Sequence, residues 1–139
     1  MYLLDTNVVS ALRRPNDVDA NVRTWAANVQ LAELFLSTIT VLEIERGILL
    51  IERRDPAQAA ILRTWLEGHV LTDFAGRIFP VDVPVARRCA PLHVPDRQPE
   101  RDAMIAATAL VHGLTVITRN TADFTGTGVA LLNPWDAPV

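Results

Sequence analysis

The chain has 139 residues, half of them hydrophobic, which is enough for a buried core and excludes wholesale disorder. Its formal net charge of −3 gives no overall electrostatic attraction to nucleic acid. All 13 basic residues are arginine, the side chain best suited to paired contacts with phosphate. The single Cys89 excludes an internal disulfide and a cysteine-based zinc site, and the absence of a leader-like or long apolar segment predicts a cytoplasmic protein that does not enter a membrane.

Strand-like and helical segments alternate along the chain, which predicts an α/β fold with a parallel sheet covered on both faces. The expected strands span residues 2–4, 34–37, 78–81, 115–118 and 129–132. The expected helices span residues 6–13, 41–54, 56–71, 84–92 and 103–112. One more helix is expected between the first two, capped at residues 15–17 and ending near residue 29. No repeat or linker divides the sequence, so we expect residues 1–139 to form one domain.

Four acidic residues follow the expected strands or open the next helix. Asp5 closes the first strand and Glu43 opens the helix after the second. Asp102 opens the helix before the fourth strand, and Asp123 follows that strand. The carboxyl ends of parallel strands gather at one edge of the sheet, where clustered carboxylates repel one another unless a divalent cation joins them. The pattern therefore predicts an oxygen-ligated Mg²⁺ or Mn²⁺ site suited to phosphodiester chemistry.

Each acid also has a purely structural interpretation. Asp5 is a candidate helix N-cap, and Glu43 completes a capping box with Thr40. Asp102 is placed to stabilise a helix N-terminus through the macrodipole, and Asp123 to form an Asx-turn. Helix N-termini also help to hold clustered carboxylates, so capping and metal binding are compatible uses of one geometry.

Neighbouring residues refine this hypothesis. Glu45 is the rival of Glu43, but a residue two positions along a helix points to a different side. Gly47 costs about 1 kcal/mol relative to Ala inside a helix, which suggests that something needs the space on the face of Glu43. Thr118 and Asn120 are candidates for orienting a metal-bound water, with ordinary strand-end hydrogen bonding as the alternative.

Four segments resemble the motifs of PIN-domain ribonucleases, in the order of that family: residues 4–8, residues 39–43 with Gly47, residues 102–109 and residues 118–124. The closing Asn133-Pro134-Trp135 resembles the VapC/FitB branch of bacterial toxins in particular. The resemblance implies a three-layer α/β/α PIN-like fold with a short central parallel sheet. It also implies a Mg²⁺- or Mn²⁺-dependent endoribonuclease that acts as the toxin of a toxin–antitoxin pair.

Carried over by position, the resemblance assigns Asp5, Glu43 and Asp102 as the core catalytic and metal-binding acids. Some relatives place the fourth acid where this chain has Asn120, so Asp123 has to supply that charge here. The implied partners are an RNA substrate, a cognate antitoxin protein and a second copy of the chain, as a homodimer or a higher assembly with the antitoxin. The helix around Trp25 and the helix over residues 56–71 are the candidate surfaces.

Two other functions compete with this one. A haloacid-dehalogenase-like phosphatase forms an aspartyl-phosphate, for which Asp5 is the candidate. Such enzymes need a second Asp where this chain has Asn7 and a Lys that it lacks. The other alternative is a catalytically silent PIN-fold scaffold or RNA-binding module, which loss of one or more acids would mark; all four positions are filled.

Overall fold

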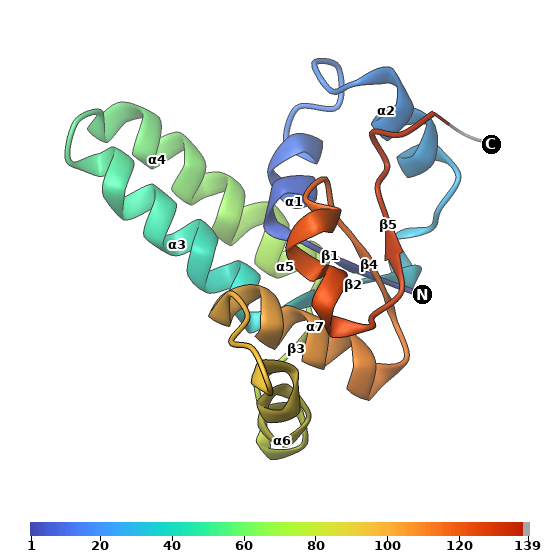
Figure 1. Ribbon diagram of the computed structural model, residues 1–139. Helices are drawn as coiled ribbons and strands as arrows, with labels where there is room; N and C mark the ends of the chain where they lie inside the picture. Colours follow the sequence, from blue (N-terminus) through green and yellow to red (C-terminus); the bar gives the residue numbers. More distant parts are fainter. Residues whose placement is uncertain (138–139) are drawn as a thin grey trace.

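Five short parallel strands form one sheet in the computed structural model, which describes residues 1–137. The spatial order is β3-β2-β1-β4-β5, and every neighbouring pair is parallel (Figure 1). The strands are β1 (Tyr2–Leu4), β2 (Leu34–Ser37), β3 (Ile78–Phe79), β4 (Thr115–Ile117) and β5 (Leu131–Leu132). All five expected strands are present, and the third, fourth and fifth are shorter than predicted.

Alternate residues of the central strands face opposite sides of the sheet. Leu3 and Val116 belong to one buried cluster, whereas Leu4 and Ile117 belong to the other. Because both faces are buried, the strands are mostly apolar, as expected for a parallel sheet between two layers of helices. The predicted three-layer α/β/α arrangement is confirmed.

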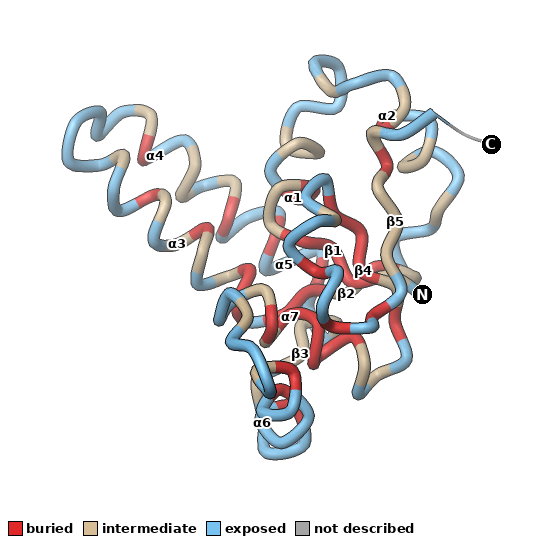
Figure 2. The backbone as a smooth tube through the Cα atoms, in the orientation of Figure 1, coloured by how far each residue is buried: buried red, intermediate tan, exposed pale blue. Residues whose placement is uncertain are grey.

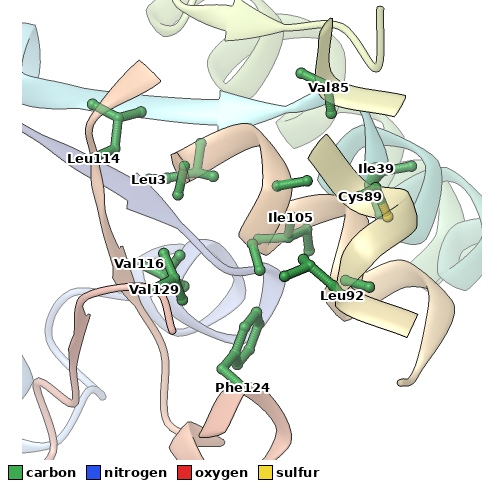
Figure 3. Packing of buried hydrophobic residues seen from close by; sticks show 14 residues of the cluster. Leu3, Ile39, Val85, Cys89, Leu92, Ile105, Leu114, Val116, Phe124 and Val129 are labelled. Atoms are coloured by element: carbon green, nitrogen blue, oxygen red, sulfur yellow. The ribbon is translucent and has the colours of Figure 1, made fainter. Parts of the chain in front are cut away.

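The helical segments divide between these two layers. In chain order they are α1 (Thr6–Leu12), α2 (Ala20–Ala27), η1 (Leu31–Glu33), α3 (Thr38–Glu52), α4 (Pro56–Trp65), η2 (Leu66–Val70), α5 (Leu71–Asp73), α6 (Val83–Cys89), η3 (Ala90–His93), α7 (Glu100–His112) and η4 (Thr121–Thr127). Residues of α6, α7 and η4 pack on the face of Leu3, where Ile105 and Phe124 are almost completely buried (Figure 3). Residues of α1, α3, α4 and η2 cover the face of Leu4.

Helices α3 and α4 form an antiparallel hairpin that projects from the body of the molecule (Figure 1). Its tip, around Asp55, is exposed, whereas the central strands β1, β2 and β4 and the middle of α7 are mostly buried (Figure 2). Asp55 caps α4 and Pro56 occupies its first turn, as the sequence predicts. The predicted continuous helix over residues 56–71 is interrupted by the π-helical turn η2, and its last turn is α5.

Three helix starts differ from the prediction by more than one residue. Helix α7 begins at Glu100, so Asp102 lies within its first turn and does not open the helix as expected. Helix α3 begins at Thr38 and is capped by Ser37, whose hydroxyl accepts the Ile39 N–H at 3.0 Å. Glu43 therefore lies in the second turn, so the expectations that it opens the helix and forms a capping box with Thr40 are wrong. Helix α2 is capped by Asp19 rather than by residues 15–17.

The strand order places a topological switch point between β1 and β4. From β1 the chain adds β2 and then β3 on one side, and afterwards crosses to add β4 and β5 on the other. Connections that leave in opposite directions open a crevice at the carboxyl ends of the two strands, which is where open α/β sheets bind ligands. Leu4 pairs with Ile117 at that edge, so the next residues, Asp5 and Thr118, lie beside each other.

Candidate active site

Asp5 occupies the centre of the crevice. It is only 6% exposed, and its Oδ1 accepts the Thr6 N–H at 2.8 Å as the N-cap of α1. Its Oδ2 accepts the Thr118 hydroxyl at 2.8 Å and the Asn7 amide at 3.2 Å. The structural role expected for a capping aspartate is thus confirmed, and the remaining oxygen is fixed by two side chains that have no part in capping.

Thr118 and Asn7 link the ends of β1 and β4. The Asn7 Nδ2 lies 3.3 Å from the Thr118 Oγ1, and the Asn7 Oδ1 accepts the Arg119 N–H at 3.2 Å. Asn120 takes part through its backbone, because its N–H donates to the Thr118 hydroxyl at 3.0 Å. The sequence interpretation missed Asn7; the available signal was a side-chain amide two residues after the central acid, within the first turn of the same helix.

Glu43 faces the same crevice from α3. Its Oε1 accepts the Thr6 hydroxyl at 2.9 Å, and its Oε2 lies 3.9 Å from the Arg101 Nε. Glu45 instead forms an ion pair with Arg63 of α4, so the two acids point to different sides as predicted. A Cβ added at Gly47 would meet nothing within 4 Å, so no neighbour in the described part of the chain accounts for the glycine.

The charges of the four acids act on one another. Burial and then, in decreasing order of effect, the charges of Asp5, Asp123 and Glu43 together raise the pKa of Asp102 to about 6, against the charge of Arg101, which lowers it. Burial also raises the pKa of Asp5, against the hydrogen bonds from Thr118, Thr6 and Asn7, which lower it, and the Asp123 charge adds to the increase. Asp102 lies in the first turn of α7 and Asp123 in η4. The fold has therefore gathered negative charge from four separate segments.

The donor set fits a hard divalent cation, because the group is made of carboxylate and hydroxyl oxygens and a cation would relieve the repulsion that raises the Asp102 pKa. Within residues 1–137, no three His, Cys, Asp or Glu side chains stand close enough to hold one metal ion as they lie. Binding through three of the acids therefore requires their side chains to rotate towards a common point.

The chain and its fold have counterparts among known proteins. Residues 2–128 match the PIN domain family. This chain belongs to the PIN-domain family.

PIN-domain relatives match the chain over its whole length. It is 40% identical over 141 residues to toxin FitB of Neisseria gonorrhoeae, covering 97% of this chain and 99% of the relative. It is 36% identical over 143 residues to VapC ribonuclease Y4jK of Sinorhizobium fredii, covering 98% and 99%. The solved structure of FitAB bound to an IR36 DNA fragment contains a chain with a TM-score of 0.89 and 37% identity, with coverage of 100% of this chain and 99% of that one.

These matches confirm the resemblance to the VapC/FitB branch and leave no support for the phosphatase alternative. In the part of the chain that the structure describes, no helix is long and apolar enough to cross a bilayer.

Proposed function

We propose that this PIN-domain protein is a divalent-metal-dependent endoribonuclease that acts in the cytoplasm as the toxin of a toxin–antitoxin pair. One observation carries the proposal: four charge-coupled carboxylates gather at the switch point of a fold shared, over its full length, with proteins named as a VapC ribonuclease and a FitB toxin. Such an acidic crevice repels RNA phosphates unless cations neutralise it, so nuclease activity and metal binding belong together.

Within this proposal, Asp5, Glu43, Asp102 and Asp123 hold Mg²⁺ or Mn²⁺. When bound, the metal supplies charge neutralisation at the scissile phosphate and lowers the pKa of a coordinated water. The chain's own residues prepare that site. Thr118 fixes the Asp5 carboxylate through the 2.8 Å hydrogen bond to its Oδ2. Burial and neighbouring negative charge disfavour the ionised form of Asp102, as its raised pKa shows. A cation bound nearby would therefore stabilise that ionised form strongly.

Glu43 has the position of a proton acceptor. Its Oε1 is oriented by the Thr6 hydroxyl, and its Oε2 has Arg101 at 3.9 Å as its nearest charged partner. A carboxylate oriented in this way can bind water and accept a proton from it. Asn120 stabilises the Thr118 hydroxyl through its backbone N–H, which leaves its side-chain amide to orient water or RNA.

The partners follow from the same relatives. Solved structures of similar chains are described as FitAB and as FitAcB from Neisseria gonorrhoeae, and another as a toxin–antitoxin complex from Klebsiella pneumoniae. We infer a cognate antitoxin for this chain, and a homodimer or higher assembly with that antitoxin. Helix α2 with Trp25 and the hairpin helix α4 are the proposed contact surfaces. An antitoxin arginine entering the acid group would compete with the metal for its carboxylates.

The test is cleavage of a labelled RNA by purified wild-type protein in EDTA, and again after adding Mg²⁺ or Mn²⁺. Asp5→Asn is the variant expected to be inactive, because it loses the carboxylate charge. It should still fold, because asparagine retains an oxygen that accepts the Thr6 N–H and so retains the helix cap. Asp96→Asn, at an exposed loop aspartate, is the control. We expect metal-dependent cleavage by wild type and Asp96→Asn only. Equal cleavage by Asp5→Asn would refute the assigned site, and no cleavage by any folded protein would favour the silent scaffold.

A further inference from the structure

A second cleft adjoins the acid group on the side of α1 and the C-terminal segment. Its volume is about 310 Å³, and its lining includes Arg13, Arg14, Arg119 and Trp135. It is separate from the four carboxylates, none of which lines it. The segment from Arg14 to the start of α2 and the segment after β5 lie at the same end of the molecule (Figure 1).

Arg119 joins this cleft to the acid group. It follows Thr118 directly in the chain, and its backbone N–H donates to Asn7, the residue that also donates to Asp5. Its guanidinium lies over the Trp135 ring, 5.1 Å from the ring centre. Within residues 1–137 the guanidinium makes no hydrogen bond or ion pair, so all of its N–H donors are available to a ligand.

The platform under Arg119 is fixed by the fold. The Trp135 N–H donates to the Asn133 Oδ1 at 2.9 Å, and the Trp135 carbonyl accepts the Asn21 amide of α2 at 2.9 Å. The ring is half-buried against the cluster that covers one face of the sheet. A guanidinium held over such a ring loses less side-chain freedom on binding an anion than a free one does.

The part of the lining between α1 and α2 is also held by specific contacts. Arg23 of α2 donates three hydrogen bonds, at 3.2–3.3 Å, to the carbonyls of Pro15, Asn16 and Val18. This segment carries the cleft's two acids, Asp17 and Asp19, and Asp19 is engaged as the cap of α2.

The basic residues follow α1 away from the acids. Asp5 is the N-cap of α1 and Arg13 its C-cap, so the seven residues of the helix, about 10 Å at its usual rise, separate the acid group from Arg13, and Arg14 follows. Arg13, Arg14 and Arg119 make no ion pair in the described residues. Three free arginines thus lead outward from an acidic centre.

We propose that this cleft binds the phosphate backbone of the RNA strand beside the scissile bond, with Arg119 held by Trp135 as the first phosphate contact and Arg14 as the next. This inference rests on the proposed ribonuclease function and identifies where its single-stranded substrate runs. Arginine matches phosphate through paired N–H donors, and sequence-independent affinity for RNA comes mainly from such contacts. The cleft accounts for RNA binding by a chain whose net charge is negative.

The test is binding of a 5′-fluorescein-labelled 12-nucleotide single-stranded RNA, followed by anisotropy in EDTA at several KCl concentrations. The proteins are wild type, Arg119→Gln, Arg14→Gln, Trp135→Phe and the control Arg87→Gln. Arg87 is an exposed arginine of α6, which lies at the far end of the molecule from α2 (Figure 1). Thermal unfolding of each variant establishes that it is folded.

We expect Arg119→Gln and Arg14→Gln each to reduce the slope of log affinity against log salt by about 0.7, the value for one lost phosphate contact on a single strand. Trp135→Phe retains the guanidinium charge and should weaken binding less than Arg119→Gln. Arg87→Gln should bind like wild type. Unchanged slopes for both cleft variants, an equal change in Arg87→Gln, or no RNA binding by wild type would overturn the inference.

Cleavage by wild type in Mg²⁺ separates this inference from the proposed function. Cleavage with unchanged slopes would overturn the cleft and leave the ribonuclease intact. Reduced slopes without cleavage would support the cleft as an RNA-binding surface and overturn the ribonuclease.

Discussion

Replacing Asp102 with asparagine should stabilise the metal-free protein at neutral pH. Asp102 has a pKa raised to about 6 from an ordinary value of 3.8, first by burial and then by the charges of Asp5, Asp123 and Glu43. Folding therefore favours its protonated form. The stability contributed by that form is fully present below about pH 4 and is lost as the pH rises through about 6. Above pH 6 the folded protein carries an ionised carboxylate among three others.

The size of the effect follows from the pKa. A pKa displaced by about two pH units corresponds to about 3 kcal/mol, and screening of this half-buried carboxylate by solvent reduces it to about 1–2 kcal/mol. The charge also stabilises the first turn of α7 by about 0.5 kcal/mol, which the variant loses. Asparagine retains the shape and removes the charge. The net gain should be about 1 kcal/mol, or roughly 4 °C in the unfolding midpoint.

The assay is thermal and urea unfolding of wild type and Asp102→Asn in EDTA, at pH 4.5, 6 and 7.5, with Asp96→Asn as the exposed control. The gain should be largest at pH 7.5 and small at pH 4.5. Added Mg²⁺ should stabilise wild type more than the variant, because binding to the folded state alone raises its stability. A variant less stable than wild type at pH 7.5, or a difference that does not change with pH, would refute the argument.

Two further substitutions test the scaffold and the site. Ser37→Ala removes the acceptor of the buried Ile39 N–H and should cost about 1–2 kcal/mol in urea unfolding, whereas unchanged stability would show that Ser37 does not cap α3. Thr118→Val removes the hydrogen bond that lowers the Asp5 pKa, so that pKa rises. If cleavage needs ionised Asp5, as proposed, the acidic limb of the pH–rate profile should move to higher pH; an unmoved profile would rule out Thr118 as a positioning residue.

The sheet and the position of Asp5 could be predicted because the conformation that each residue type favours locally is the one it adopts in the fold. The segment ending at Leu4 is apolar and is followed at once by an aspartate that caps a helix, so the pattern specifies both the strand end and the acid. Asp55 followed by Pro56 identified the start of α4 for the same reason. In each case one residue type is suited to the local backbone, and no tertiary contact has to override it.

The start of α3 could not be read in the same way. Thr38, Ile39 and Thr40 are β-branched and favour strand, yet Ile39 and Thr40 are buried in the helix. Packing decides their conformation, and the signal that remains is Ser37, a preferred cap. The π-helical turn η2 is likewise invisible in the sequence, because the apolar periodicity continues through it from Leu66 to Val70.

The grouping of the four acids could be predicted, and the residues that support them less so. Asp5, Glu43, Asp102 and Asp123 carry a charge that stands out beside apolar segments. Asn7 was not identified, since its importance lies in joining the ends of two strands that are far apart in the sequence. The cleft of Arg119 and Trp135 depends on the same kind of long-range packing, and only the structure brings α1, β4 and the C-terminal segment together.

The most direct test of the central claim is inducible expression of wild type and Asp5→Asn in bacteria, with growth followed and the 5′ ends of total RNA sequenced. Soluble protein is confirmed in both cultures. The account predicts growth arrest and discrete new RNA ends with wild type only. Unimpaired growth and no new ends with soluble wild type, or the same ends with Asp5→Asn, would contradict it.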